Sequence, residues 1–254
     1  MAGDDGDEDR VEFMPETMAK IAELSPRLAN ISSLLSMVPV FTATVNNATT
    51  PLTVSTPEGG RMAYFFLEYA DAVLFQKAVT EQTKLDTPTQ VITLSLADII
   101  DAYAGPEAVA AKESFVVIPT MPAVVRARKL LRKRGATDEQ LNSVLGPGSG
   151  LVPIFWIESL AAETAAGKQR KILFFRERDA LAMWKNITDA QAEKGDIEMR
   201  EPEVMVADLL AVADHLVQNN KTDDVIFAPS SSALRVYSAG RAAASAAADG
   251  AAGG

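Results

Sequence analysis

The sequence predicts an α/β fold, with α+β as the alternative, in which two similar sheet-plus-helix units have a pseudo-two-fold arrangement. The main observation is that four short motifs recur in the same order, between 109 and 114 residues further along the chain. They are VPVF at 38–41 with VPIF at 152–155, AYFFLE at 63–68 with LFFRE at 173–177, LADII at 96–100 with VADLL at 206–210, and VVIP at 116–119 with IFAP at 226–229. The second observation is that strand-like and helix-like segments alternate within each copy. A period this long indicates duplication of a whole folding unit rather than a solenoid of short repeats.

The duplication divides the chain of 254 residues into four parts, and the length allows one large domain or two of ordinary size. The parts are an acidic N-terminal extension over 1–24, repeat unit one over 25–135, repeat unit two over 136–237, and an Ala/Gly tail over 238–254. The tail is of low complexity and is expected to be disordered.

Composition excludes several classes of function. The net charge of -10 argues against nucleic-acid binding, which requires a basic face. No apolar run is long enough for a membrane-spanning helix, and the absence of cysteine removes disulfides and thiolate chemistry. The acidic first dozen residues are unlike a transit peptide, so a transit peptide is either absent or has been removed from this sequence.

The first copy is expected to open with a helix capped by Ser25, because serine before a proline at the first helical position favours a helix start. Asp71 is expected to open a second helix, since carboxylates are favoured where backbone N–H groups are free. The remaining elements expected in this copy are strands over 38–45, 52–55, 62–67, 91–96 and 115–118 and a helix over 97–103.

The second copy repeats this order. TDEQ at 137–140 is a capping-box pattern that opens a helix, and GPGSG at 146–150 is expected to end it. This glycine segment lacks the Lys-Ser/Thr pair of a phosphate-binding loop. Asp179 is expected to open a helix as Asp71 does, and residues 160–168 are rich in alanine and poor in strand signals.

The double phenylalanine of each copy is the candidate binding surface. Side chains alternate across a strand, so Phe65 and Phe66 must point to opposite faces of their sheet, and so must Phe174 and Phe175. One face should be covered by the helices of the same copy. The other face is either buried core or an exposed apolar groove for a partner.

No set of catalytic or metal-binding residues repeats between the copies. Asp98 aligns with Asp208, and these could form a symmetric carboxylate pair, although helix capping is the expected role of both. His215 is the only histidine and cysteine is absent, so no transition-metal site is expected. An all-oxygen Ca²⁺ or Mg²⁺ site is the open alternative, although no calcium-loop pattern is present, and no cofactor is expected. The sequence therefore predicts a protein that is not an enzyme.

A basic helix after Pro122 stands out in an otherwise acidic chain. Residues three and four apart share a helix face, so its charges form adjoining strips. The alternatives for this candidate docking patch are a solvated face, anionic lipid, an acidic partner or the acidic N-terminus of the same chain. The patch consists of Arg126, Arg128, Lys129, Arg132, Lys133 and Arg134.

Taken together, these motifs resemble the twenty-two-kilodalton Tic family, soluble components of the translocon at the inner chloroplast envelope with cyanobacterial relatives. The resembling stretches are 38–41, 63–71, 95–98, 152–155, 173–179 and 223–229. The resemblance implies a pseudo-symmetric α/β protein with apolar grooves that acts as a chaperone for precursors between the outer and inner envelope translocons.

Two functions follow as expectations from the residues and the resemblance. One is a non-enzymatic, chaperone-like factor in plastid protein import that binds unfolded precursors, located in the intermembrane space if it is like the family. The other is a structural accessory subunit docked peripherally on a plastid membrane complex, such as a photosystem–antenna assembly, at the stroma or thylakoid surface. The second would use the charged, unrepeated segments as docking elements, with a possible peripheral membrane contact.

Overall fold

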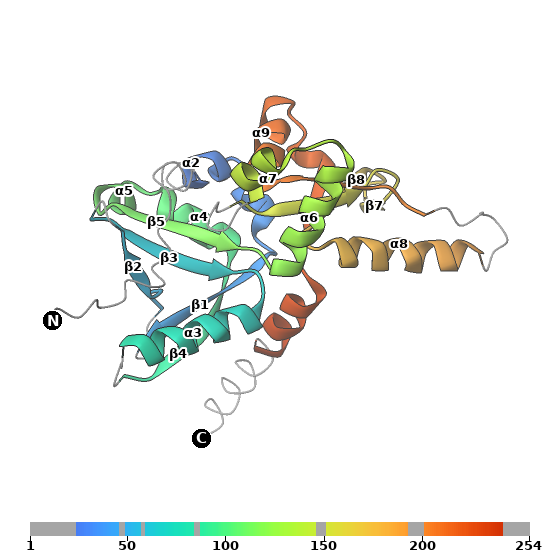
Figure 1. Ribbon diagram of the computed structural model, residues 1–254. Helices are drawn as coiled ribbons and strands as arrows, with labels where there is room; N and C mark the ends of the chain where they lie inside the picture. The colour runs from blue at the N-terminus through green and yellow to red at the C-terminus, as the bar shows by residue number, and fades with distance from the viewer. Residues whose placement is uncertain are drawn as a thin grey trace, which may run out of the picture.

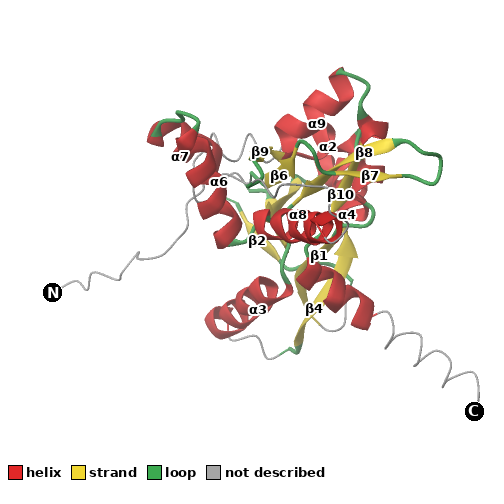
Figure 2. Cartoon of the chain, turned by 90° about the vertical axis from the view of Figure 1, so that its right-hand side faces the viewer, coloured by secondary structure: helices red, strands yellow, loops and turns green. Residues whose placement is uncertain are grey.

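Two five-stranded sheets with the same strand arrangement form the centre of the protein, and helices pack around both (Figures 1 and 2). The predicted duplicated α/β fold is therefore confirmed. The computed structural model describes residues 24–45, 49–56, 59–83, 87–145, 151–192 and 201–240. The predicted helix stop at 146–150, most of the acidic extension and residues 241–254 of the tail lie outside the described residues.

The first copy contains one sheet and the helices between its strands. Its elements are α2 (Leu24–Ala29), η1 (Ser32–Leu35), β1 (Pro39–Val45), β2 (Thr53–Ser55), β3 (Arg61–Phe66), α3 (Tyr69–Thr83), β4 (Thr89–Ser95), α4 (Leu96–Ala104), α5 (Pro106–Ala110), β5 (Glu113–Ile118) and α6 (Met121–Lys133).

The second copy follows the same plan and ends in a helix over 231–240. Its elements are α7 (Asp138–Leu145), β6 (Pro153–Ile157), β7 (Ala161–Glu163), β8 (Gln169–Phe174), α8 (Glu177–Ala192), β9 (Val204–Asp208), α9 (Leu209–Gln218), η2 (Thr222–Asp224) and β10 (Val225–Ala228). The Ala-rich segment at 160–168 forms strand β7, which pairs with β8 through a turn at Gly167, so its weak strand signals were misleading.

Strand pairing establishes which residues of the two copies are equivalent. The strand order is β4–β1–β3–β5 in the first sheet and β9–β6–β8–β10 in the second, and β2 and β7 pair with β3 and β8. All pairs are antiparallel except β3 with β5 and β8 with β10. Phe41 pairs with Phe66, and Phe155 pairs with Phe174 in the same way. Phe66 and Phe174 are therefore equivalent and lie 108 residues apart.

Two of the four sequence alignments need correction. The double-phenylalanine motif was aligned one residue out, because Phe66 corresponds to Phe174 and Phe65 to Leu173. The LADII match was three residues out, because Ser95 pairs with Pro39 as Asp208 pairs with Pro153. The double-phenylalanine strand is apolar on both faces in each copy, so the hydrophobic pattern did not determine its register.

The core explains the two-faced phenylalanine strands. Phe65 and Phe175 belong to a central core that contains residues of both copies, together with α4, α9 and α2. Phe66 lies in an outer cluster on the first sheet, and Phe174 lies in an outer cluster on the second. The prediction that each adjacent pair points to opposite faces is confirmed.

The two copies exchange helices. Helix α6 follows the last strand of the first sheet, but its Ala123 and Ala127 are buried against the outer face of the second sheet. The helix over 231–240 follows the last strand of the second sheet and packs Ala233 and Val236 on the outer face of the first (Figure 1). The predicted division between units at 135/136 is therefore crossed by packing in both directions.

The first helices of the two copies differ in their packing. Helix α2 begins at Leu24, one residue before the predicted cap at Ser25, and contacts α4 and α9 in the central core. Helix α7 packs instead against α6. Its predicted capping box is confirmed, since Thr137 and Gln140 exchange hydrogen bonds of 2.9 and 3.2 Å between side chain and backbone. Within the described ranges, no helix is long and apolar enough to cross a membrane.

Candidate functional site

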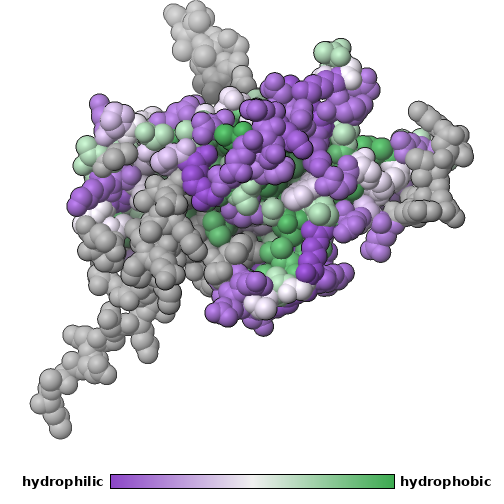
Figure 3. Space-filling view, turned by 90° about the horizontal axis from the view of Figure 1, so that it is seen from above, coloured by the Kyte–Doolittle hydropathy of each residue, from purple (hydrophilic) through white to green (hydrophobic). Residues whose placement is uncertain are grey.

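An apolar groove of about 510 Å³ lies on the inner face of the second sheet, beside α9. Figure 3 looks down on the side of the molecule that carries α9 and shows hydrophobic residues gathered in hollows between hydrophilic ones. The walls of the groove come from β6, β8, β9, α9 and β10. Its apolar lining consists of Trp156, Leu173, Ala207, Ala211, Val212, Leu216 and Val225.

Along the groove, the second copy has smaller side chains at three positions where the first copy has aromatic rings. Phe65, Tyr103 and Phe115 pack against one another with ring centroids 5.3 to 6.1 Å apart. Their equivalents in the second copy are aliphatic: Leu173, Leu216 and Val225. Ala207 likewise stands where the first copy has Leu94.

The aromatic cluster of the first copy also remains neutral. Burial, reinforced by the nearby Glu113 carboxylate, raises the pKa of Tyr103 to about 12. The phenol therefore stays protonated at physiological pH and is compatible with a closed apolar face.

The rim of the groove is charged and holds one aromatic ring in place. Glu158 accepts a hydrogen bond of 2.6 Å from the indole Nε1 of Trp156 and one of 2.7 Å from Lys171 Nζ. These two donors, Lys171 first, lower the pKa of Glu158 below its usual value. Trp156 is half-buried and stands where the first copy has Thr42, so the second copy presents an oriented ring at the surface.

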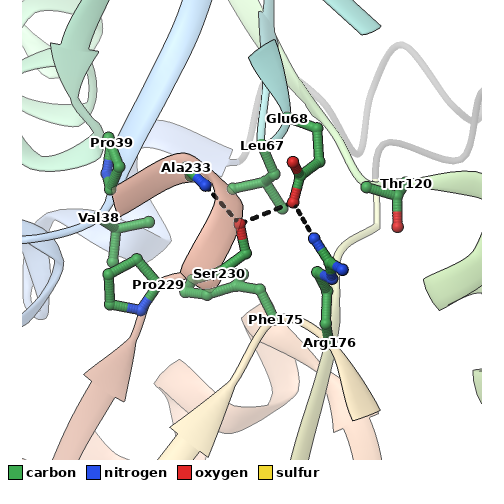
Figure 4. A pocket seen from close by; sticks show the side chains of 10 residues that line it. All are labelled: Val38, Pro39, Leu67, Glu68, Thr120, Phe175, Arg176, Pro229, Ser230 and Ala233. Carbon is green, nitrogen blue, oxygen red and sulfur yellow. Dashed lines mark hydrogen bonds and ion pairs between the residues drawn. The ribbon is translucent and has the colours of Figure 1, made fainter. Parts of the chain in front are cut away.

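The junction between the two copies is held by an ion pair between equivalent positions. Glu68 and Arg176 each follow the central strand of their sheet, 108 residues apart, and their Oε1 and Nη1 atoms lie 2.5 Å from each other. Their side chains are 14% and 11% exposed. Ser230 and Ser232 add hydrogen bonds of 2.7 to 2.8 Å to Glu68, and Figure 4 shows the carboxylate between Arg176 and Ser230. One position of the repeat therefore carries opposite charges in the two copies, and these charges join them.

A second hollow of about 650 Å³ opens beside this junction, between the starts of α3, α6 and α8. Its lining mixes both signs of charge, with Asp71 and Glu177 facing Arg126 and Arg178. Burial, followed by the negative charge of Glu68, raises the pKa of Asp71. Asp71 and Asp179 lie in the first turns of α3 and α8, so their predicted position at helix starts is confirmed.

The four arginines of the predicted basic patch form hydrogen bonds or ion pairs with neighbouring side chains. Arg126 forms a two-point ion pair with the buried Glu177, which raises the arginine pKa. Arg128 donates to Asn142, Arg132 pairs with Asp138, and Arg134 pairs with Glu203 at 3.2 Å.

Among the described residues of the patch, Lys129 and Lys133 are the two that are exposed and whose side chains form no hydrogen bond or ion pair with another described residue. They lie on the same strip of α6 as Met121 and Val125, whose exposed fractions are 70% and 57%. The free face of α6 is therefore half apolar and half basic.

The predicted apolar surface of four phenylalanines is not a surface in this structure. The exposed fractions of the four side chains are 0% for Phe65, 7% for Phe66, 2% for Phe174 and 3% for Phe175. Helices cover both faces of each sheet, so these rings form core. The open groove lies beside them, at positions that the shifted alignment did not identify.

The carboxylates Asp98 and Asp208 are not a symmetric pair. Asp208 is the N-cap of α9 and accepts hydrogen bonds from the backbone of Leu210, Ala211 and Val152. Burial raises its pKa, and these hydrogen bonds offset part of the rise. Asp98 is exposed in the first turn of α4, where Ser95 is the N-cap.

His215 lies on the rim of the groove, with its Nδ1 3.3 Å from the Asn219 side chain. Among the described residues, no group of three or more His, Asp or Glu side chains is placed to hold a metal ion. The groove, at about 510 Å³, is smaller than the hollow of about 650 Å³ beside the junction, and it offers a ligand apolar contact within a charged rim.

Comparison with known proteins agrees with the resemblance found in the motifs. The family model for the Tic22-like family matches residues 15–238. This chain belongs to the Tic22-like family. No curated protein matches the chain.

Two solved structures share the Tic22 fold with this chain. Tic22 from Plasmodium falciparum is 16% identical, with a TM-score of 0.63 over 82% of this chain and 95% of that one. Anabaena Tic22, described as a protein of protein transport, is 17% identical, with a TM-score of 0.63 over 85% of this chain and 96% of that one. At this level of identity, the likeness establishes the fold.

Proposed function

We propose that this protein is a non-enzymatic, chaperone-like factor in plastid protein import that binds segments of unfolded precursors in the apolar groove of its second sheet. Membership of the Tic22-like family supports a role in plastid protein translocation. The neighbour from Anabaena is described as a protein of protein transport, which supports the same class of function.

The groove is the observation that carries the proposal. It offers an apolar floor of Leu173, Leu216 and Val225 within a charged rim, which suits an extended or helical segment with alternating character. The proposed location is the plastid, in the intermembrane space, as either a soluble or a peripheral protein.

Binding of a fluorescently labelled, urea-unfolded plastid precursor to the folded protein tests this function. The substitution Ala211→Glu places a charge on the exposed wall of the groove and should weaken binding at least tenfold, because the carboxylate must be desolvated. Leu74→Glu is the matched control, since Leu74 is 64% exposed on α3, away from the groove. Its binding should equal that of the parent protein.

Failure of the parent protein to bind any unfolded precursor would refute the proposed function. Equal weakening by both substitutions would refute the groove as the site. Substitutions at the four core phenylalanines are unsuitable, because their burial means that polar replacements would unfold the protein.

A second candidate function rests on the free face of α6. Met121 and Val125 continue into Lys129 and Lys133 along one strip, a pattern that suits peripheral docking on an anionic surface of a plastid membrane complex. This would make the protein a structural accessory subunit.

Isolation from gently solubilised plastid membranes separates the two functions. Stoichiometric retention with one complex, lost on replacing Lys129 and Lys133 with glutamate but not on Lys77→Glu, would favour the accessory subunit. Recovery as a free protein would favour the chaperone.

A further inference from the structure

We infer that the groove of the second copy is built to receive an aromatic side chain from the bound polypeptide. This inference rests on the proposed function and names the kind of segment that the groove selects. The internal repeat supplies the evidence, because the first copy shows what fills the equivalent space.

In the first copy, the equivalent space contains rings that belong to the protein itself. Phe65 meets Phe115 and Tyr103 edge to face, at interplanar angles of 79° and 78°. Edge-to-face pairs of this kind are a preferred aromatic geometry. The backbone frame around them is the same as in the second copy, since β3 and β5 pair as β8 and β10 do.

In the second copy, the frame remains but aliphatic side chains stand at these three positions, and the aromatic pair of this copy, Phe175 with Phe227, lies elsewhere in the central core. Leu173, Leu216 and Val225 are each at most 5% exposed, so they form a floor rather than filling the space above it. The remaining hollow is lined on one side by Trp156, a half-buried ring whose orientation is set by its hydrogen bond to Glu158.

These features favour an aromatic occupant over an aliphatic one. A ring that enters the groove would lie against the Trp156 indole and restore the aromatic packing that the first copy makes internally. Such ring–ring contacts contribute beyond the burial of apolar area alone. An aliphatic side chain would gain the burial but not the ring–ring contact.

The experiment uses peptides that differ in one side chain. Soluble twelve-residue peptides of serine, glycine and asparagine carry one central phenylalanine, cyclohexylalanine or leucine, and are titrated into the ¹⁵N-labelled full-length protein. The readout is the indole N–H signal of each of the two tryptophans. Trp184 packs in the outer cluster of the second sheet and serves as the internal control.

The phenylalanine peptide should shift the Trp156 signal, leave the Trp184 signal unchanged, and bind at least threefold more tightly than the cyclohexylalanine and leucine peptides. A protein in which the first-copy residues are transplanted, by L173F, L216Y and V225F together, should lose this response. The single substitution Ala207→Leu, which introduces the residue that the first sheet has at Leu94, should weaken binding of the phenylalanine peptide. This variant allows the location to be tested even if the triple variant does not fold.

Equal affinity for phenylalanine and cyclohexylalanine would overturn the aromatic preference while leaving precursor binding intact. Unchanged peptide binding by Ala207→Leu would overturn the location. A Trp156 signal that moves with protein concentration in the absence of peptide would identify a second copy of the chain as the occupant, and would also overturn the inference. If the parent protein does not bind unfolded precursor at all, the proposed function is refuted, and this outcome is distinct from the three that concern the aromatic occupant.

Discussion

The inner faces of the two sheets share one backbone plan but have different surfaces. In the first copy, three aromatic rings close the face, and in the second, aliphatic residues at the same positions leave a groove. The contrast shows that duplication preserved the frame while the side chains diverged. One copy has the features of a scaffold and the other those of a binding site.

The same divergence appears at the junction. Glu68 and Arg176 occupy one position of the repeat, and their opposite charges join the copies. A symmetric pair of identical residues would place like charges together, which is unfavourable. The opposite charges of the two copies therefore avoid a repulsion at this point and form an ion pair in its place.

The largest effect is expected from breaking this ion pair. Glu68→Ala should lower the free energy of unfolding by about 3 kcal/mol, because Arg176 is left mostly buried without its main counter-charge. The measurement is urea denaturation followed by circular dichroism. The exchange of charges, Glu68→Arg with Arg176→Glu, should recover more than half of the loss.

Lys185→Ala provides the control, since its pair with Asp189 is exposed on α8 and should contribute no more than about 0.5 kcal/mol. If Glu68→Ala behaves like this control, the ion pair does not hold the copies together.

A smaller difference is expected between the equivalent caps Asp208 and Ser95. Asp208 accepts three backbone hydrogen bonds, whereas Ser95 accepts one from Asp98 at 3.1 Å. Asp208→Ala should therefore cost about 2 kcal/mol and Ser95→Ala about 0.5–1 kcal/mol in unfolding free energy, measured by thermal and urea denaturation.

Asp208→Asn should cost less than Asp208→Ala at pH 7 but should not be neutral. Asparagine also caps helices, and burial raises the pKa of Asp208, which means that the charged form is less favourable in the folded than in the unfolded protein. However, both carboxylate oxygens accept backbone hydrogen bonds, and asparagine has only one acceptor oxygen. Equal costs for both alanine substitutions would show that the two caps have not diverged in strength.

The smallest effect concerns the rim of the groove. The pKa of Glu158 is lowered, so its contacts with Lys171 and Trp156 are present above the usual glutamate pKa and are lost as pH falls through the lowered value. The indole signal of Trp156 should titrate with a midpoint below the usual glutamate pKa, while that of Trp184 should not. Lys171→Ala should raise this midpoint. An unchanged midpoint would contradict the assigned contact.

The sequence was sufficient for the fold class, the duplication and the two-faced strands. VPVF and its repeat aligned correctly because Pro39 and Pro153 open the same strand in each sheet. The helix exchange could not be predicted, since the apolar face of α6 does not indicate which sheet it covers.

The groove was missed because it depends on register. The double phenylalanines, aligned one residue out, concealed that Phe65 corresponds to Leu173. Aspartate suits both the N-cap and the first turn, so Asp98 and Asp208 also aligned wrongly. A difference of one residue determines which side chains are compared across the repeat.

The exchange of helices has a consequence for how the chain is made. The strands of the first sheet are complete once Ile118 has been synthesised, and α3 already lies on their outer face, but the second helix on that face is formed by residues 231–240. The first half therefore emerges from the ribosome with its outer face covered by α3 alone, and the part of this face that receives Ala233 and Val236 stays uncovered until the last helix arrives. A nascent chain of this protein has an exposed apolar patch of its own until its last helix has been made.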